Sequence, residues 1–133
     1  MANLTQVLNQ IIGLKVSSQE MHNYINSLDK ETYALLSTVY AIGRDGWEKT
    51  YVDTPECNRF IEEQEAQGVR VTNQMLDTKF LTKEIKKNQY NLTYGYELKD
   101  LIKEDGIYRH NWLSLKTNLV SSVKNGISLV NEI

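Results

Sequence analysis

Hydrophobic residues recur every three or four positions along most of the chain, which is the spacing of helices that bury one face. The first such run lies at 4–12, and Gly13 follows it as a stop. A second run begins after a capping-box pattern, in which Ser17 precedes Glu20 by three positions. The pattern therefore predicts a helix at 4–12 and another at about 18–28.

The third run, at 29–42, has the widest apolar face in the chain. Asp29 stands where a helix N-cap is expected, and Gly43 stands where a glycine ends a helix. Its apolar residues spread over more than one face: Tyr33, Leu35, Leu36, Val39, Tyr40 and Ile42. Because such a helix contacts more than one neighbour, we expect it at the centre of the fold, with the long C-terminal helix packed against it.

The pattern continues through the rest of the chain. Thr54 and Pro55 mark the start of a fourth helix, since threonine caps helices and proline is tolerated at the first helical position. Gly68 ends it. Further apolar runs predict helices at 72–87, at 98–102 and from 108 or 111 to 130. For the first of these, a division at Asp77-Thr78 is left open.

The last of these helices has a stripe in mixed three- and four-residue steps, formed by Trp112, Leu115, Leu119, Val123, Ile127 and Val130. A helix of this length is suited either to packing across several others or to forming the seam of a homodimer. The sequence leaves both uses open.

The segment 88–96 interrupts the helical pattern, because it is rich in Asn and Tyr and poor in good helix formers. It is interpreted as an extended loop or a short strand. Taken together, the patterns predict an all-α protein, a single domain over 1–133, built as a bundle of about six helices with a short extended segment near 88–96.

Composition narrows the class of protein. Hydrophobic residues make up 41% of the 133 positions, and 17 acidic against 15 basic residues give a net charge of −2. Such a balance disfavours non-specific binding to nucleic acid. The single cysteine, Cys57, fits a reducing compartment, and neither a signal peptide nor a membrane-spanning run is visible. We therefore expect a cytoplasmic protein with no membrane partner.

The sequence shows no constellation that carries chemistry. His22 has no second ligand-type residue at helical spacing, and His110 has neither a nucleophile nor an orienting acid beside it. We accordingly predict no catalytic residues, no metal site and no cofactor, and we expect that the protein is not an enzyme.

Two groups of residues are candidate contact surfaces for a protein partner. Glu62, Glu63 and Glu65 make the outer side of the fourth helix acidic, and Tyr90, Tyr94 and Tyr96 alternate in the Asn-rich segment. Tyrosine is suited to recognition because its rigid amphipathic ring gives contact area at low entropic cost. The alternative is structural: such rings also pack on neighbouring helices while their hydroxyl groups reach water.

A second possibility is a small-ligand or nucleotide pocket made of arginines and aromatic rings. Arg44 and Trp47 lie in one turn, and Arg109 and Trp112 lie in another. An arginine–aromatic set of this kind can hold a planar anion. The pocket requires the two turns to meet, and separate salt bridges for the two arginines would argue against it.

The stretch Tyr24-Ile25-Asn26-Ser27-Leu28-Asp29, continuing to Ala41-Ile42-Gly43-Arg44-Asp45-Gly46, resembles an uncharacterised bacterial family described as domain of unknown function 3775. The later Met75-Leu76-Asp77-Thr78-Lys79-Phe80-Leu81 is similar to a downstream Leu-rich segment of that family. The resemblance implies a small, mainly helical protein of bacterial or phage origin. It implies no chemistry, so it assigns no residue a role.

By elimination, the sequence predicts a small protein that acts by binding another macromolecule. The expected class is a protein–protein inhibitor, such as a phage-encoded anti-defence protein or a toxin-neutralising immunity protein. The glutamates of the fourth helix and the tyrosine segment are then its contact surfaces.

Overall fold

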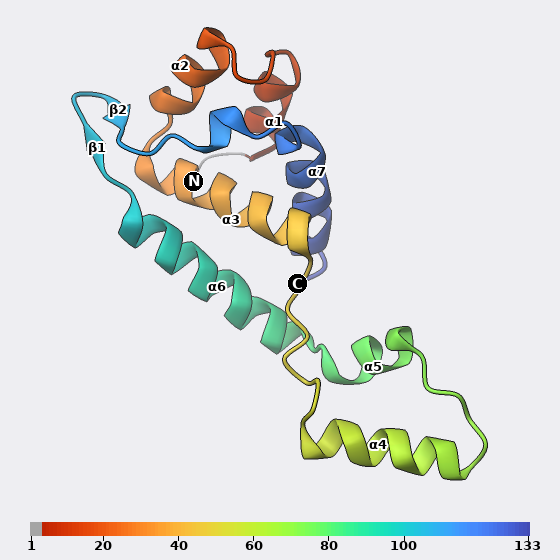
Figure 1. Cartoon of the computed structure of the whole chain (residues 1–133). Coiled ribbons are helices and arrows are strands. Elements are labelled where there is room, and N and C mark those ends of the chain that lie inside the picture. Colours follow the sequence, from red (N-terminus) through yellow and green to blue (C-terminus); the bar gives the residue numbers. More distant parts are fainter. Residues whose placement is uncertain (1–3) are drawn as a thin grey trace.

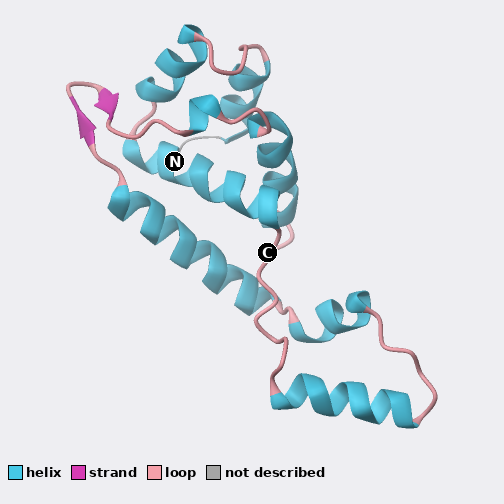
Figure 2. Ribbon diagram, in the orientation of Figure 1, coloured by secondary structure: helices cyan, strands magenta, loops and turns pink. Residues whose placement is uncertain are grey.

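The computed structural model describes residues 4–133, which form a helical protein with one small β-hairpin (Figure 1, Figure 2). The first helices are α1 (Leu4–Ile12), α2 (Gln19–Ser27) and α3 (Lys30–Asp45). They are followed by α4 (Pro55–Ala66), α5 (Asn73–Phe80) and α6 (Lys83–Asp100). The chain ends with β1 (Lys103–Glu104), β2 (Ile107–Tyr108), a 3₁₀ turn η1 (Leu113–Leu115) and α7 (Leu119–Val130). The predicted all-α fold class is confirmed.

Side-chain caps start most of the helices. Ser18, Asp29 and Thr54 each accept the backbone N–H three positions further on, at 3.1, 2.7 and 3.3 Å, and so begin α2, α3 and α4. The starts of all three helices lie where they were predicted. The capping box of Ser17 and Glu20 is wrong, however, because Ser17 lies before the helix with a φ of 62° and Ser18 is the cap. Thr72 and Thr82 cap α5 and α6 in the same way, at 3.2 and 3.3 Å.

α3 is the central helix, as predicted, and α7 crosses it at very close range. The close approach depends on two glycines: a Cβ on Gly43 would lie 1.7 Å from the carbonyl oxygen of Ser122, and a Cβ on Gly126 would lie 2.0 Å from that of Val39. Asn125 Nδ2 also donates to the carbonyl of Gly43 at 2.8 Å. Two helix backbones can come this close only where neither has a side chain.

Gly43 is therefore not the residue that ends the helix, and that prediction is wrong. α3 continues to Asp45 and ends at Gly46, whose φ of 76° lies in the left-handed region that favours glycine. A glycine inside a helix and a glycine after it look alike in sequence. Here the packing against α7 requires Gly43 to lie inside the helix.

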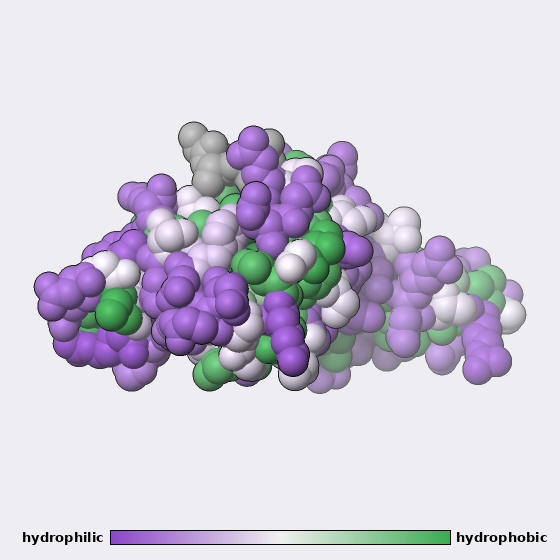
Figure 3. Space-filling model, turned by 90° about the horizontal axis from the view of Figure 1, so that it is seen from above, coloured by the Kyte–Doolittle hydropathy of each residue, from purple (hydrophilic) through white to green (hydrophobic). Residues whose placement is uncertain are grey.

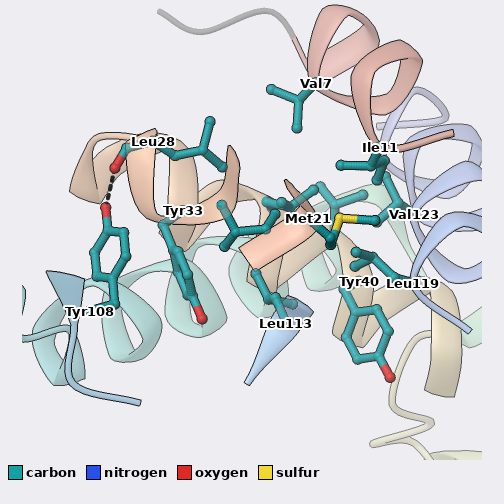
Figure 4. Packing of buried hydrophobic residues seen from close by; sticks show 13 residues of the cluster. Val7, Ile11, Met21, Leu28, Tyr33, Tyr40, Tyr108, Leu113, Leu119 and Val123 are labelled. Carbon is teal, nitrogen blue, oxygen red and sulfur yellow. Dashed lines mark hydrogen bonds between the residues drawn. The ribbon is translucent and has the colours of Figure 1, made fainter. Parts of the chain in front are cut away.

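The core lies between α1, α2, η1 and α7 on one side and α3 on the other (Figure 4). Its fully buried side chains come from all of these elements and include Ile11, Met21, Ile25, Tyr33, Leu36, Leu113, Leu119 and Val123. Tyr40 spans the edge of this core, where its hydroxyl donates to Asn118 Oδ1 at 2.7 Å.

The β-hairpin is fastened to the junction of α2 and α3. β1 pairs with β2 in antiparallel register, with Lys103 opposite Tyr108. The Tyr108 hydroxyl donates to the carbonyl of Leu28, as the dashed line in Figure 4 marks, and Lys103 Nζ donates to the same carbonyl at 2.9 Å. Burial raises the pKa of Tyr108 to about 12, so its hydroxyl stays a donor throughout the physiological range.

The C-terminal helix is shorter than predicted, because the chain from 108 to 118 forms β2, η1 and turns before α7 begins at Leu119. The predicted stripe is wrong at Leu115, which is 61% exposed, whereas Leu113 is fully buried. In α7 itself, Leu119 and Val123 are buried in the core. These two residues of the stripe therefore pack within the chain, and a homodimer through this helix stays a prediction.

The predicted extended segment at 88–96 is also wrong, since all of it lies inside α6. The predicted helix at 72–87 is instead two helices, α5 and the start of α6, which separate at Leu81 and Thr82. The 98–102 helix is replaced by the last turn of α6 and the residues that lead into β1. The short extended segment of this fold is the hairpin at 103–108.

α4, α5 and their connections project from the rest of the molecule as an arm, which we define as residues 47–82 (Figure 1). Seen from above, the arm is a narrow extension that carries both hydrophobic and hydrophilic residues (Figure 3). At its base the Tyr51 hydroxyl donates to the Asp77 carboxylate, which holds the pKa of Asp77 below its usual value. Residues 4–46 and 83–133 form the remaining part, the body.

Candidate functional site

α6 lies beside α3 and runs in the opposite direction (Figure 1). A groove of about 460 Å³ opens between them. One wall comes from the start of α3 and the other from the middle of α6. We name it the tyrosine groove, and it is lined by Asp29, Glu31, Thr32, Leu35, Tyr90, Asn91 and Tyr94. It brings together two of the three tyrosines that the sequence singled out.

The spacing of residues along α6 explains why these two tyrosines meet. Neighbouring pairs of half-buried residues recur every four positions on the side of α6 that faces α3: Ile85 and Lys86, Gln89 and Tyr90, Thr93 and Tyr94, Glu97 and Leu98. Tyr96 falls between the pairs and is 66% exposed. It lines a separate hollow with Ala41, Glu48 and Leu92, so the three tyrosines do not form one surface.

The charge of the tyrosine groove is negative. Two carboxylates, those of Asp29 and Glu31, lie in its lining, and within the described chain that lining contains no Lys or Arg. Hydrogen bonds from Thr32 lower the pKa of Asp29, which keeps this group ionised at neutral pH. Burial raises the pKa of Tyr90, so its hydroxyl stays neutral. Neutral tyrosine rings beside carboxylates are a favourable environment for a cation.

One more carboxylate lies on the same side of α6. Burial, with the nearby charge of Asp100, raises the pKa of Glu97 above its ordinary value of 4.5. Folding therefore favours the neutral form of this group. Its contribution to stability is greatest below pH 4.5 and falls as the pH rises through the raised pKa.

We expect Glu97→Gln to raise the melting temperature at pH 7 measurably, because it removes a charge that is half-buried and lies near that of Asp100. At pH 3.5 the wild-type group is already neutral, so the gain should vanish. Thermal unfolding of both proteins at the two pH values measures this. Glu84→Gln, an exposed position on the same helix, is the control and should give no gain. An equal gain at both pH values would contradict the assignment.

The second predicted surface is separate from the groove. Glu62, Glu63 and Glu65 are exposed on α4, in the arm, whereas the tyrosine groove belongs to the body (Figure 1). None of the three takes part in a salt bridge among residues 4–133. Their charge faces water, and a single compact partner site does not include both surfaces.

The structure does not join the two arginines into one anion pocket. Arg44 makes a two-pronged pair with Asp45, at 2.9 and 2.8 Å, and lies over the ring of Tyr40. Arg109 pairs with Glu104 across the hairpin at 2.7 Å. These are the separate salt bridges that argue against the pocket.

The two tryptophans of that set also have structural surroundings. Trp47 is buried at the base of the arm, with 8% of its surface exposed. Trp112 packs edge-on against Tyr40, with 5.5 Å between the ring centres. Trp112 and Arg44 thus share Tyr40 as a neighbour, but Arg109 and Trp47 do not complete a site with them.

Sequence reasoning missed one polar cluster, formed by His22, Asn111 and Ser114. His22 Nδ1 lies 3.2 Å from Ser114 Oγ, and Asn111 Nδ2 donates to the carbonyl of His22 at 3.4 Å. A serine beside a histidine suggests nucleophilic catalysis. Here Ser114 is almost fully buried and donates to the carbonyl of Asn111, and within residues 4–133 no carboxylate is hydrogen-bonded to His22. The cluster ties α2 to η1. Because 92 positions separate His22 from Ser114, no local motif reveals it.

Comparisons with known proteins add no assignment. No family model, no curated protein and no solved structure matches the chain. Within residues 4–133, no three His, Cys, Asp or Glu side chains gather in a way that could hold a metal ion. None of the described helices has both the length and the apolar character needed to cross a membrane. The resemblance to domain of unknown function 3775 stays a prediction.

Proposed function

We propose that this chain is a non-catalytic binding protein of the cytoplasm that holds a partner protein through the tyrosine groove. The observation that carries the proposal is the groove itself, in which two tyrosine rings and two carboxylates line one hollow between α3 and α6. Within the described residues, no hydrogen bond or ion pair engages the hydroxyls of Tyr90 and Tyr94 or the carboxylate of Glu31. These groups are free to contact a partner.

The chemistry of the lining indicates what the partner presents. A lysine or arginine side chain entering the groove gains from the ring faces of Tyr90 and Tyr94 and from the charges of Asp29 and Glu31. Leu35 adds an apolar contact for the stem of that side chain. A basic segment of another protein is therefore the preferred occupant.

The biological class stays that of the elimination argument: an inhibitor, such as a phage-encoded anti-defence protein or a toxin-immunity protein. An inhibitor of this kind needs a rigid surface and no reaction chemistry. The support lies in the firm attachment of α3 to the core, since ten of its residues are buried. On this proposal the partner is a toxin or a defence enzyme, and its activity falls when the complex forms.

The proposal predicts that Tyr90→Ala together with Tyr94→Ala weakens the complex at least about tenfold, because both ring contacts are lost. Tagged full-length chain, immobilised and exposed to a lysate of its own host, captures the partner, and mass spectrometry identifies it. Tyr96→Ala is the matched control, since it removes the same side chain from the same helix outside the groove. Equal recovery with the double variant and with wild type would rule out the groove as the contact surface.

A further inference from the structure

The arm does not bury its own apolar residues. Of its side chains only Trp47, Tyr51 and Cys57 are buried, and neither α4 nor α5 makes an extensive contact with another helix. Phe80 holds the arm together by packing against Tyr51 and Phe60, with ring centres 5.6 and 5.7 Å apart. Two helices in a single layer cannot enclose a core, because stable domains pack at least two layers.

The accessible surface area of this chain is larger than that of a compact monomer of the same mass. A compact monomer of 15.4 kDa exposes about 7,200 Å², whereas this chain exposes 8498 Å². The excess is about 1,300 Å². Each partner in a stable dimer buries about 800 Å², so the unpaired chain has more than enough surplus surface for such an interface. Exposed apolar residues in the arm include Val52 and Val69, at 56% and 38%.

Charged residues in and beside the arm lie at helix ends where their interaction with the helix dipole is unfavourable. Glu62, Glu63 and Glu65 lie in the last turns of α4, where the helix dipole is negative, and no basic residue offsets them there. Lys83, Lys86 and Lys87 lie in the first turns of α6, where the dipole is positive, and Glu84 in the first turn offsets only part of their charge. None of these six residues makes a salt bridge within residues 4–133. An opposite charge from outside the chain would relieve both ends.

The two charged ends are also placed for reciprocal contact. α4 ends at the tip of the arm, and α6 begins at its base (Figure 1). When two arms lie antiparallel, the acidic tip of each meets the basic base of the other. This is the self-complementary arrangement of a two-fold dimer.

We propose that the arm binds a second copy of this chain. The acidic end of α4 in one copy faces the basic start of α6 in its partner, and the half-buried apolar faces of α4 and α5 cover each other. The inference does not rest on the tyrosine groove, which lies on the body and stays open in such a dimer.

Sedimentation velocity of the full-length chain over a range of protein and salt concentrations tests the proposal. We expect a dimer that dissociates on dilution and more readily at high salt. Glu62→Lys with Glu63→Lys should raise the dissociation constant at least about tenfold, and so should Lys83→Glu with Lys87→Glu. Mixing the two variants should restore a dimer, because the mixed dimer has one acidic–basic contact with its signs exchanged and one contact identical to wild type.

Glu20→Lys with Glu132→Lys, at two exposed positions outside the arm, changes the net charge as much as Glu62→Lys with Glu63→Lys, so it is the matched control and should leave the dimer intact. Circular dichroism of every variant checks that the helices are retained. A wild-type chain that sediments as a monomer at all concentrations would overturn the proposal. Dimers that persist in both charge-reversed pairs would overturn it as well.

Discussion

Gly43→Ala should destabilise the protein by about 3 kcal/mol or more. The added methyl group would stand 1.7 Å from the carbonyl oxygen of Ser122 and 2.6 Å from the nitrogen of Gly126. Both are backbone atoms of α7, so no side-chain rotation relieves the overlap. α3 and α7 would have to separate, which opens the core between them. Urea unfolding monitored by circular dichroism measures the loss.

Gly95→Ala is the matched control, because Gly95 is also helical and nothing lies within 4 Å of a Cβ placed there. Alanine at that position should stabilise α6 by up to about 1 kcal/mol, since glycine is the poorer helix former. Opposite signs for the two substitutions are the expected result. Little or no loss with Gly43→Ala would mean that the helices do not cross as closely as described.

Leu113→Ala should cost about 2–5 kcal/mol. The Leu113 side chain is fully buried and comes from η1, which packs against α2. Its removal leaves a cavity in the centre of the core, where the surrounding helices have little freedom to close it. Thermal or urea unfolding gives the change in the free energy of unfolding.

Leu115→Ala is the matched comparison, because it tests whether Leu115 lies outside the core. Leu115 is 61% exposed, so its truncation should change stability by less than about 0.5 kcal/mol. A continuous helix with Leu115 on its inner stripe predicts the reverse order. A larger loss of stability for Leu115→Ala than for Leu113→Ala would therefore contradict the structure and support the continuous helix predicted from the sequence.

The N-terminal half of the fold could be predicted closely because its signals are local. Caps at Asp29 and Thr54 act on N–H groups three residues away, and the stripe of α1 is regular. The apolar set of α3 predicted a central helix, and α3 is central. Its end was misplaced because the reason for Gly43 lies 79 or more positions further on, at Ser122 and Gly126.

The sequence of α6 contains a helical spacing that its composition obscures. Asn and Tyr are weak helix formers, which favoured an extended segment at 88–96. Tyr90 and Tyr94 nevertheless stand four apart, the spacing that places two side chains on one helix face. Thr82, at the cap position, marks where that helix begins. Contact with α3 outweighs the weak local preference.

The candidate site could be predicted only in part. The tyrosines were recognisable as residue types suited to binding, but their partners in the groove, Glu31 and Leu35, come from a helix about 55 positions earlier. Whether Tyr96 belongs with them depends on the rotation of α6 about its axis, and that rotation is set by the packing on α3. The arginine–aromatic pocket requires two turns that are distant in sequence to meet, which no local pattern reveals. In the structure Arg44 pairs with Asp45 and Arg109 pairs with Glu104, in separate salt bridges.

The groove and the arm assign different roles to surfaces that the sequence grouped together. On the two proposals, the tyrosines of the groove contact a basic partner on the body, and the glutamates of α4 contact a second copy of the arm. Charge reversal at Glu62 and Glu63 should thus alter self-association and leave capture through the groove intact. A negative result for one proposal therefore leaves the other untouched.

The most direct test of the groove is the dissociation constant of the purified complex, measured by titration calorimetry for wild type, for Tyr96→Ala and for the chain with both Tyr90→Ala and Tyr94→Ala. We expect wild type and Tyr96→Ala to bind alike and the double variant to bind at least about tenfold more weakly. Equal affinities for all three proteins, with the fold intact by circular dichroism, would contradict the assignment of the tyrosine groove as the binding surface.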